Sequence, residues 1–223
     1  HLEVIGKETV RKELEYIPAT LKVVEYVSVH YGCPKCKTDE EKPNIIHAPV
    51  PPALLRSYAS PSIVAWVIYS KYVNGMPLYR QEKDWLQYGF ELSRATMANW
   101  VIECTDKYLR VLYEFYHRLL LSREFAMADE SPIQVLKEEE REATAKSYVI
   151  GRKGWLFSDS PEGAEVSAIS YSIAETALAN GLNVYKYITY VLEKRPTEEM
   201  ADSELEKLLP WNDKVFEICK IER

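Results

Sequence analysis

The chain has 223 residues, of which 47% are hydrophobic and 28% are charged, and its formal net charge is −6 at pH 7. This balance is typical of a globular protein and excludes an intrinsically disordered chain. No run of about 18 apolar residues predicts a membrane span, and the acidic net charge restricts any DNA-binding face to a local cluster of Lys and Arg.

Residues 1–31 alternate apolar and polar side chains and predict short strands in a small β-rich piece. The polar, Pro-rich residues 37–52 are predicted to form a linker. The period changes to that of a helix at Ser60, which is a good N-cap, and Pro61 suits the first helical turn. This first helix is expected to end at residues 75–77.

A second helix is predicted over residues 78–88, stopped by Gly89, and a third is expected to begin after a cap at Ser93. The third helix carries the strongest periodic signal in the chain, because apolar residues recur every three or four positions. This pattern predicts one long helix with a single buried stripe. The stripe consists of Met97, Val101, Cys104, Tyr108, Val111, Phe115 and Leu119.

Short apolar stretches at residues 125–128, 133–136 and 147–150 predict three strands, the first of which ends at Asp129 and Glu130. Carboxylates at the tip of a strand can bind magnesium, although one acidic pair does not make a two-metal site. The alternative is a solvated strand end.

The remainder of the chain is predicted to be helical. A turn is expected at residues 160–163, and an amphipathic helix over 164–180 is closed by Gly181. The next helix, over 183–193, begins with an Asn cap. A last, acidic helix is expected over residues 196–209.

Cys33 and Cys36 have the spacing of half a structural zinc site. A complete tetrahedral site needs four ligands, commonly two such pairs. His30 and His47 could contribute, but their spacing fits no zinc pattern, and the alternative is a pair of reduced surface thiols on a turn. Four scattered cysteines in the whole chain make a disulfide scaffold unexpected and a cytoplasmic location the expected one.

Residues 78–103 have the layout of a helix-turn-helix unit, whose second helix enters the DNA major groove. The alternative is a plain helical hairpin within a bundle. A second basic group, Arg152 and Lys153 beside Trp155, could contact a phosphate backbone or form a turn whose aromatic side chains fill a core. The candidate DNA-binding residues are Arg80, Arg94, Thr96, Asn99, Arg152 and Lys153, with Lys83 flanking them.

Taken in order, these segments resemble transposases of the insertion-sequence-66 family. The resemblance implies a mobile-element enzyme of DNA transposition and recombination, with an Asp-Asp-Glu triad on a ribonuclease-H-like fold and two magnesium ions. The matching segments are residues 31–36 in the zinc-binding segment, 77–82 and 92–96 with Trp100 in the central helical region, 128–136 around the first catalytic Asp, 151–158 in the C-terminal signature and 208–212 in the tail.

Asp129 matches the first Asp of that triad and is the implied magnesium ligand. The segments that carry the second Asp and the Glu are absent, and only 21 residues separate Asp129 from Gly151. One carboxylate cannot bind two metal ions about 4 Å apart. We therefore expect an internally deleted, N-terminally truncated and catalytically defective transposase, in which Cys33 and Cys36 are half of a zinc site.

The expected fold class is α+β and mainly α. It comprises a β-rich, zinc-ribbon-like remnant (1–45), a helix-turn-helix-like region (46–124), a ribonuclease-H-like remnant (125–150) and a helical C-terminal segment (151–223). The expected partners are DNA at the element ends and, by self-association, a second copy or an intact transposase, with no membrane. Two alternatives are a non-enzymatic regulator, which pairs with intact transposase through the long stripe or occupies element ends, and a helical module unrelated to DNA.

Overall fold

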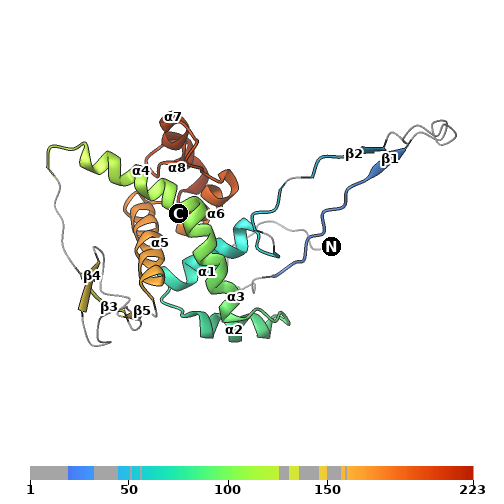
Figure 1. The fold of residues 1–223 in the computed structure, drawn as a ribbon, viewed down its shortest axis with the longest axis horizontal. Helices are drawn as coiled ribbons and strands as arrows, with labels where there is room; N and C mark the ends of the chain where they lie inside the picture. Colours follow the sequence, from blue (N-terminus) through green and yellow to red (C-terminus); the bar gives the residue numbers. More distant parts are fainter. Residues whose placement is uncertain are drawn as a thin grey trace, which may run out of the picture. The chain divides into compact units, whose positions relative to one another are not determined.

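The computed structural model describes residues 20–32, 45–50, 52–55, 57–125, 131–135, 146–149, 157–158 and 160–222. It is mainly helical (Figure 1), in agreement with the expected class. The chain divides into two compact units, residues 1–50 and 51–223. None of the helices within these described ranges is both long and apolar enough to cross a bilayer.

The first unit contains a two-stranded antiparallel ribbon, β1 (His30–Gly32) and β2 (Ile45–His47). The described residues 20–29 form no strand, so the strands predicted there are wrong. β2 lies inside residues 37–52, where only a linker was predicted. The reason is that β2 forms by pairing with β1, a contact between distant parts of the sequence that local composition does not report.

The second unit begins with three helices at the predicted positions: α1 (Pro61–Tyr72), α2 (Leu78–Gln87) and α3 (Arg94–Cys104). Ser60 and Ser93 cap α1 and α3, because each hydroxyl accepts a hydrogen bond from the backbone N–H three residues later, at 3.3 and 3.1 Å. These local caps explain why the sequence places the starts of both helices correctly.

The predicted long third helix is present over residues 94–121 and contains one irregular segment. A π-helical segment, η2 (Thr105–Leu109), separates α3 from α4 (Arg110–Leu121), and α4 continues in a different direction from α3 (Figure 1). Thr105 is fully buried at the start of this segment. The predicted apolar stripe continues across this segment, since Val101, Cys104, Val111 and Phe115 are all buried.

The C-terminal half supplies α5 (Pro161–Ala179), α6 (Val184–Lys194), α7 (Asp202–Leu205), the short 3-10 helix η3 (Glu206–Leu208) and α8 (Asp213–Cys219).

Three boundaries in this half differ from the prediction. Ser160 caps α5 by accepting from the backbone N–H of Gly163 at 3.1 Å, so the expected turn at residues 160–163 is the first helical turn. The helix expected over 196–209 begins only at Asp202. α8, which was not predicted, begins after a cap in which Asn212 accepts from the backbone N–H of Lys214 at 3.1 Å.

The helices of residues 61–121 pack directly on those of residues 161–219 and share one core with them (Figure 1). The apolar stripe of the third helix lies in this core: Met97 and Cys104 are 0% exposed and Phe115 is 2% exposed. Most of the stripe is therefore buried within its own chain, with Tyr108 and Leu119 half-buried, and it is not the exposed dimer face that the sequence suggested.

Hydroxyl groups join the two halves inside this core. Tyr72 Oη and Ser167 Oγ lie 3.2 Å apart, and Tyr116 Oη and Tyr187 Oη lie 2.5 Å apart. Burial holds the pKa of the Tyr187 phenol well above its ordinary value, so both hydroxyls of that pair remain protonated and hydrogen-bonded.

A small sheet lies between the two helical halves in the sequence. Its described backbone comprises β3 (Ser131–Val135), β4 (Lys146–Val149) and β5 (Phe157–Ser158). β3 is central, antiparallel to β4 and parallel to β5. β3 and β4 confirm two of the predicted strands, whereas most of the first, at residues 125–128, lies outside the described residues.

Candidate nucleic-acid interface

The first three helices of the second unit pack on one another, and α2 and α3 are joined by a short turn. Gly89 takes a φ of +76° in this turn, a left-handed conformation that glycine adopts without a steric cost. α2, the turn and α3 have the order of a helix-turn-helix unit, with α1 as the supporting third helix.

Gln81 fixes the corner between α1 and α2. Its side chain is 2% exposed, and its amide nitrogen donates to the carbonyl oxygens of Met76 at 2.9 Å and Val67 at 3.3 Å. Because the nitrogen faces two acceptors, the orientation of the amide is determined by the hydrogen bonds. This residue could not be predicted from the sequence, since an isolated Gln carries no local signal of burial.

The start of α3 is stabilised by two groups. The Glu82 carboxylate, on α2, accepts a hydrogen bond from the backbone N–H of Arg94 at 3.0 Å. The Ser93 hydroxyl accepts from the backbone N–H of Thr96 at 3.1 Å, and Thr96 Oγ1 lies 2.9 Å from Ser93 Oγ. The structure therefore places Thr96 in the cap, and Glu82 ties the start of α3 to α2.

The first turns of α3 present polar groups to solvent. Arg94, Ala95 and Asn99 are exposed, and Ala98 is half-buried. The Arg94 side chain makes no hydrogen bond or ion pair with another residue that the structure describes. Small alanines between a guanidinium and an amide leave room for close approach of a large surface such as a DNA groove.

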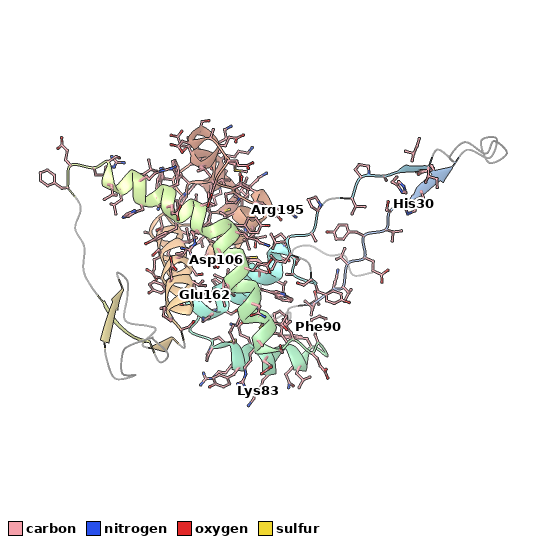
Figure 2. All side chains as sticks on the ribbon, in the orientation of Figure 1. His30, Lys83, Phe90, Asp106, Glu162 and Arg195 are labelled. Carbon is pink, nitrogen blue, oxygen red and sulfur yellow. The ribbon has the colours of Figure 1, made fainter. Side chains whose placement is uncertain are left out.

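α2 carries two further exposed cations, Arg80 and Lys83. Lys83 points outward from the helix (Figure 2), and Arg80 is exposed, with its Nε donating to Tyr79 Oη at 3.0 Å. Glu91 is an exposed acid in the same region. The exposed side chains of α2, the turn and the start of α3 thus carry both signs of charge and do not form a uniform basic surface.

This arrangement can make two kinds of DNA contact. Side chains in the first turns of a recognition helix reach base edges, where Arg pairs with guanine and Asn with adenine through two hydrogen bonds. Lys83 and Arg80 suit the less specific contacts to phosphates. The structure brings Arg80, Arg94 and Asn99 to the exposed surface of one three-helix group.

A second charged cluster has a structural role. Arg110 donates to the carboxylates of Asp106 at 2.6 Å and Glu165 at 2.5 Å, and these partners hold the pKa of its guanidinium above the ordinary value. Glu165 lies on α5, so this cluster joins the two helical halves. Its carboxylates are ion-paired to a cation, which makes them poor candidates for magnesium ligands.

The remaining predicted site residues lie outside the described residues: Cys33, Cys36, Asp129, Arg152 and Lys153. Among the residues that the structure does describe, no group of three or more His, Cys, Asp or Glu side chains is arranged to bind a metal ion. The two described cysteines, Cys104 and Cys219, are buried free thiols.

Three protein-family models match the chain. Residues 56–149 match the transposase IS66 family, residues 172–211 match the IS66 C-terminal element, and residues 1–37 match the zinc-finger binding domain of transposase IS66. The first match covers α1 to β4, including the whole candidate interface.

Curated relatives come from one bacterium, Sinorhizobium fredii (strain NBRC 101917 / NGR234). The chain is 23% identical over 193 residues to the uncharacterized protein y4jD, covering 80% of this chain and 37% of that protein. It is 30% identical over 115 residues to the uncharacterized protein y4qI, covering 51% and 20%. The chain thus spans well under half of the length of these relatives, and no solved structure matches it.

Proposed function

Since this chain belongs to the IS66 family of transposases, we propose that it binds DNA at the ends of an insertion sequence through α2 and α3. The observation that carries this proposal is the start of α3. There Arg94 and Asn99 are exposed, and the backbone beneath them is fixed by Ser93 and Glu82. A preorganised helix start with an exposed guanidinium and amide is suited to reading base edges.

We propose further that the chain does not cut DNA. The resemblance assigns an Asp-Asp-Glu triad with two magnesium ions, and this sequence offers only Asp129 from that set. The match to the transposase model ends at residue 149 and the match to the C-terminal element starts at residue 172. A single carboxylate cannot hold both metal ions that in-line phosphoryl chemistry requires.

A DNA-binding test follows from this proposal. Binding of the full chain is measured by fluorescence anisotropy against a duplex that carries an element end and against a duplex of scrambled sequence. Arg94→Ala is expected to weaken binding to the element end by about 1–3 kcal/mol and to reduce the preference over the scrambled duplex. Affinity is expected to fall steeply with salt concentration.

Lys107→Ala is the matched control, because Lys107 is an exposed cation on the same continuous helical stretch and is paired with Glu103 instead of flanking the start of α3. The control is expected to bind like the wild type. Equal losses of affinity in both variants would mean that binding depends only on the net charge of the chain, which contradicts the proposed interface. Absence of binding to either duplex at low salt would also contradict the proposal.

A regulatory function is compatible with the same interface. A chain that occupies element ends without cleaving them competes with an intact transposase for those ends. The long apolar stripe is buried in this chain, so competition for DNA is favoured over pairing through that stripe. In a transposition assay with intact enzyme, inhibition that disappears in Arg94→Ala is the expected result.

A further inference from the structure

The exposed surface of α3 is confined to three side chains in its first two turns. Arg94, Ala95 and Asn99 are the exposed residues of this helix, whose 11 residues are all described. At about 100° per residue, these three side chains and the half-buried Ala98 fall within an arc of about 140°. The buried residues of α3 lie on the other side of the helix. α3 therefore offers only a short and narrow surface to a partner.

The two long side chains on this surface are not engaged within the chain. Among the residues that the structure describes, neither the Arg94 guanidinium nor the Asn99 amide has a hydrogen-bond partner. Ala95, between them in the chain, offers only a methyl group. These three groups suit three different base edges in the major groove. Arg pairs with O6 and N7 of guanine, Asn pairs with N6 and N7 of adenine, and Ala contacts the methyl group of thymine.

The backbone at the start of α3 favours base edges over phosphates. The first N–H groups of a helix commonly bind phosphate, but here Glu82 accepts from the N–H of Arg94 at 3.0 Å and Ser93 accepts from that of Thr96 at 3.1 Å. The negative charge of Glu82 also repels a phosphate at this position. The start of α3 thus suits uncharged base edges, whereas the exposed cations of α2 remain for the phosphates.

The spacing of the three side chains limits how many base pairs they reach. Arg94 and Asn99 are five positions apart, which is about 7.5 Å along the helix axis, or roughly two base-pair steps of about 3.4 Å. Resting on the proposed DNA binding through α3, we propose that the helix recognises a core of about three or four base pairs. In this core Arg94 bonds to a guanine, Asn99 bonds to an adenine and Ala95 packs on a thymine methyl group.

A phosphate contact by Arg94 is the alternative to a guanine contact. A guanidinium binds phosphate oxygens through two hydrogen bonds as well, but such a contact carries no sequence information. Loss of Arg94 would then weaken binding to all duplexes alike, and a change in the base atoms of the core would make no difference to this loss. Base recognition instead links the loss in each variant to one base of the core.

The test uses the full chain and base analogues that alter single groups of the major-groove edge. The core is first found by selecting bound sequences from random duplexes, and it is expected to contain guanine, adenine and thymine within about four base pairs. Anisotropy then measures binding to duplexes with 7-deazaguanine, 7-deaza-adenine or uracil in the core. Each purine analogue is expected to weaken wild-type binding roughly 2- to 12-fold, the effect of one hydrogen bond, and uracil about fourfold, the effect of one buried methyl group.

Each variant is expected to lose its sensitivity to one analogue only. Arg94→Ala should lose its sensitivity to 7-deazaguanine, Asn99→Ala to 7-deaza-adenine and Ala95→Gly to uracil, while each variant keeps the other two. Lys107→Ala is the matched control and should keep all three sensitivities, because Lys107 is paired with Glu103. Helical circular dichroism checks that each variant is folded, since Gly in a helix costs some stability.

The outcomes separate these base assignments from the proposed function. A selected core without guanine or adenine would overturn the assignments, as would a sensitivity that persists unchanged in its matching variant. Either result would leave DNA binding through α3 in place, with Arg94 on a phosphate. A wild-type chain that prefers no sequence at all would overturn both the assignments and the proposed binding at element ends.

Discussion

The Glu82 carboxylate of α2 accepts a hydrogen bond from the backbone N–H of Arg94, the first residue of α3, at 3.0 Å. The first N–H groups of a helix have no partner inside the helix, so this contact satisfies one of them from a neighbouring element. It also fixes the direction of α3 relative to α2. The same residue, Arg94, carries the guanidinium that we assign to DNA.

Replacing Glu82 should therefore affect both stability and binding. Glu82→Ala is expected to lower the free energy of unfolding by about 1 kcal/mol, the usual cost of losing a helix cap, and to weaken DNA binding although Glu82 is itself an anion. Denaturant titration and anisotropy measure the two effects. Glu82→Gln keeps an acceptor oxygen and should recover most of the stability, whereas Glu91→Ala, at an exposed acid nearby, should change stability little.

The buried hydroxyl pair of Thr105 and Ser170 connects η2 to α5, with their oxygen atoms 3.2 Å apart and both residues 0% exposed. Thr105→Val leaves the Ser170 hydroxyl without this partner and is expected to cost about 1–3 kcal/mol. Ser170→Ala is expected to cost a similar amount. The double variant should cost less than the sum of the single variants, because both polar groups are removed together. Additive losses in chemical denaturation would show that the two hydroxyls do not depend on each other.

Alkaline pH should destabilise the second unit through its buried thiol. Burial, assisted by the charge of Glu103, raises the pKa of Cys104 from 9.0 to about 12. Between these values the unfolded chain releases this proton and the folded chain keeps it. The free energy of unfolding therefore falls as pH rises through this window, by up to about 1.4 kcal/mol per pH unit for this group.

Cys104→Ala isolates that contribution. The variant should lose less stability than the wild type between about pH 8 and pH 10.5, measured as the shift of the denaturant midpoint. The remaining slope includes Cys219, whose pKa burial raises to about 11. Parallel pH curves for the wild type and Cys104→Ala would mean that Cys104 ionises alike in the folded and unfolded chains.

No magnesium-dependent cleavage is expected from this chain. Incubation with element-end DNA and magnesium should leave both strands intact, because Asp129 is the sole residue that we can assign to the triad. Asp129→Ala should bind DNA as the wild type does and show the same lack of cleavage. Cleavage by the wild type that disappears in Asp129→Ala would refute the assignment of an inactive enzyme.

The sequence by itself determined the features that depend on neighbouring residues. Ser60 and Ser93 each cap a helix through the N–H three residues later, and Gly89 stops α2 with a φ of +76°. Such signals act within one turn, so they can be read without a fold. The motifs that resemble the family could be recognised from the sequence in the same way, because each is a run of adjacent residues.

Only the tertiary structure decided the features that join distant residues. The π-helical break at residues 105–109 meets a buried hydroxyl of α5, and the apolar stripe is covered by helices that come much later in the chain. His30 meets His47 through strand pairing, and Glu82 reaches Arg94 across a turn. Periodicity and composition average over one local window, whereas these contacts exist only once the chain has folded back on itself.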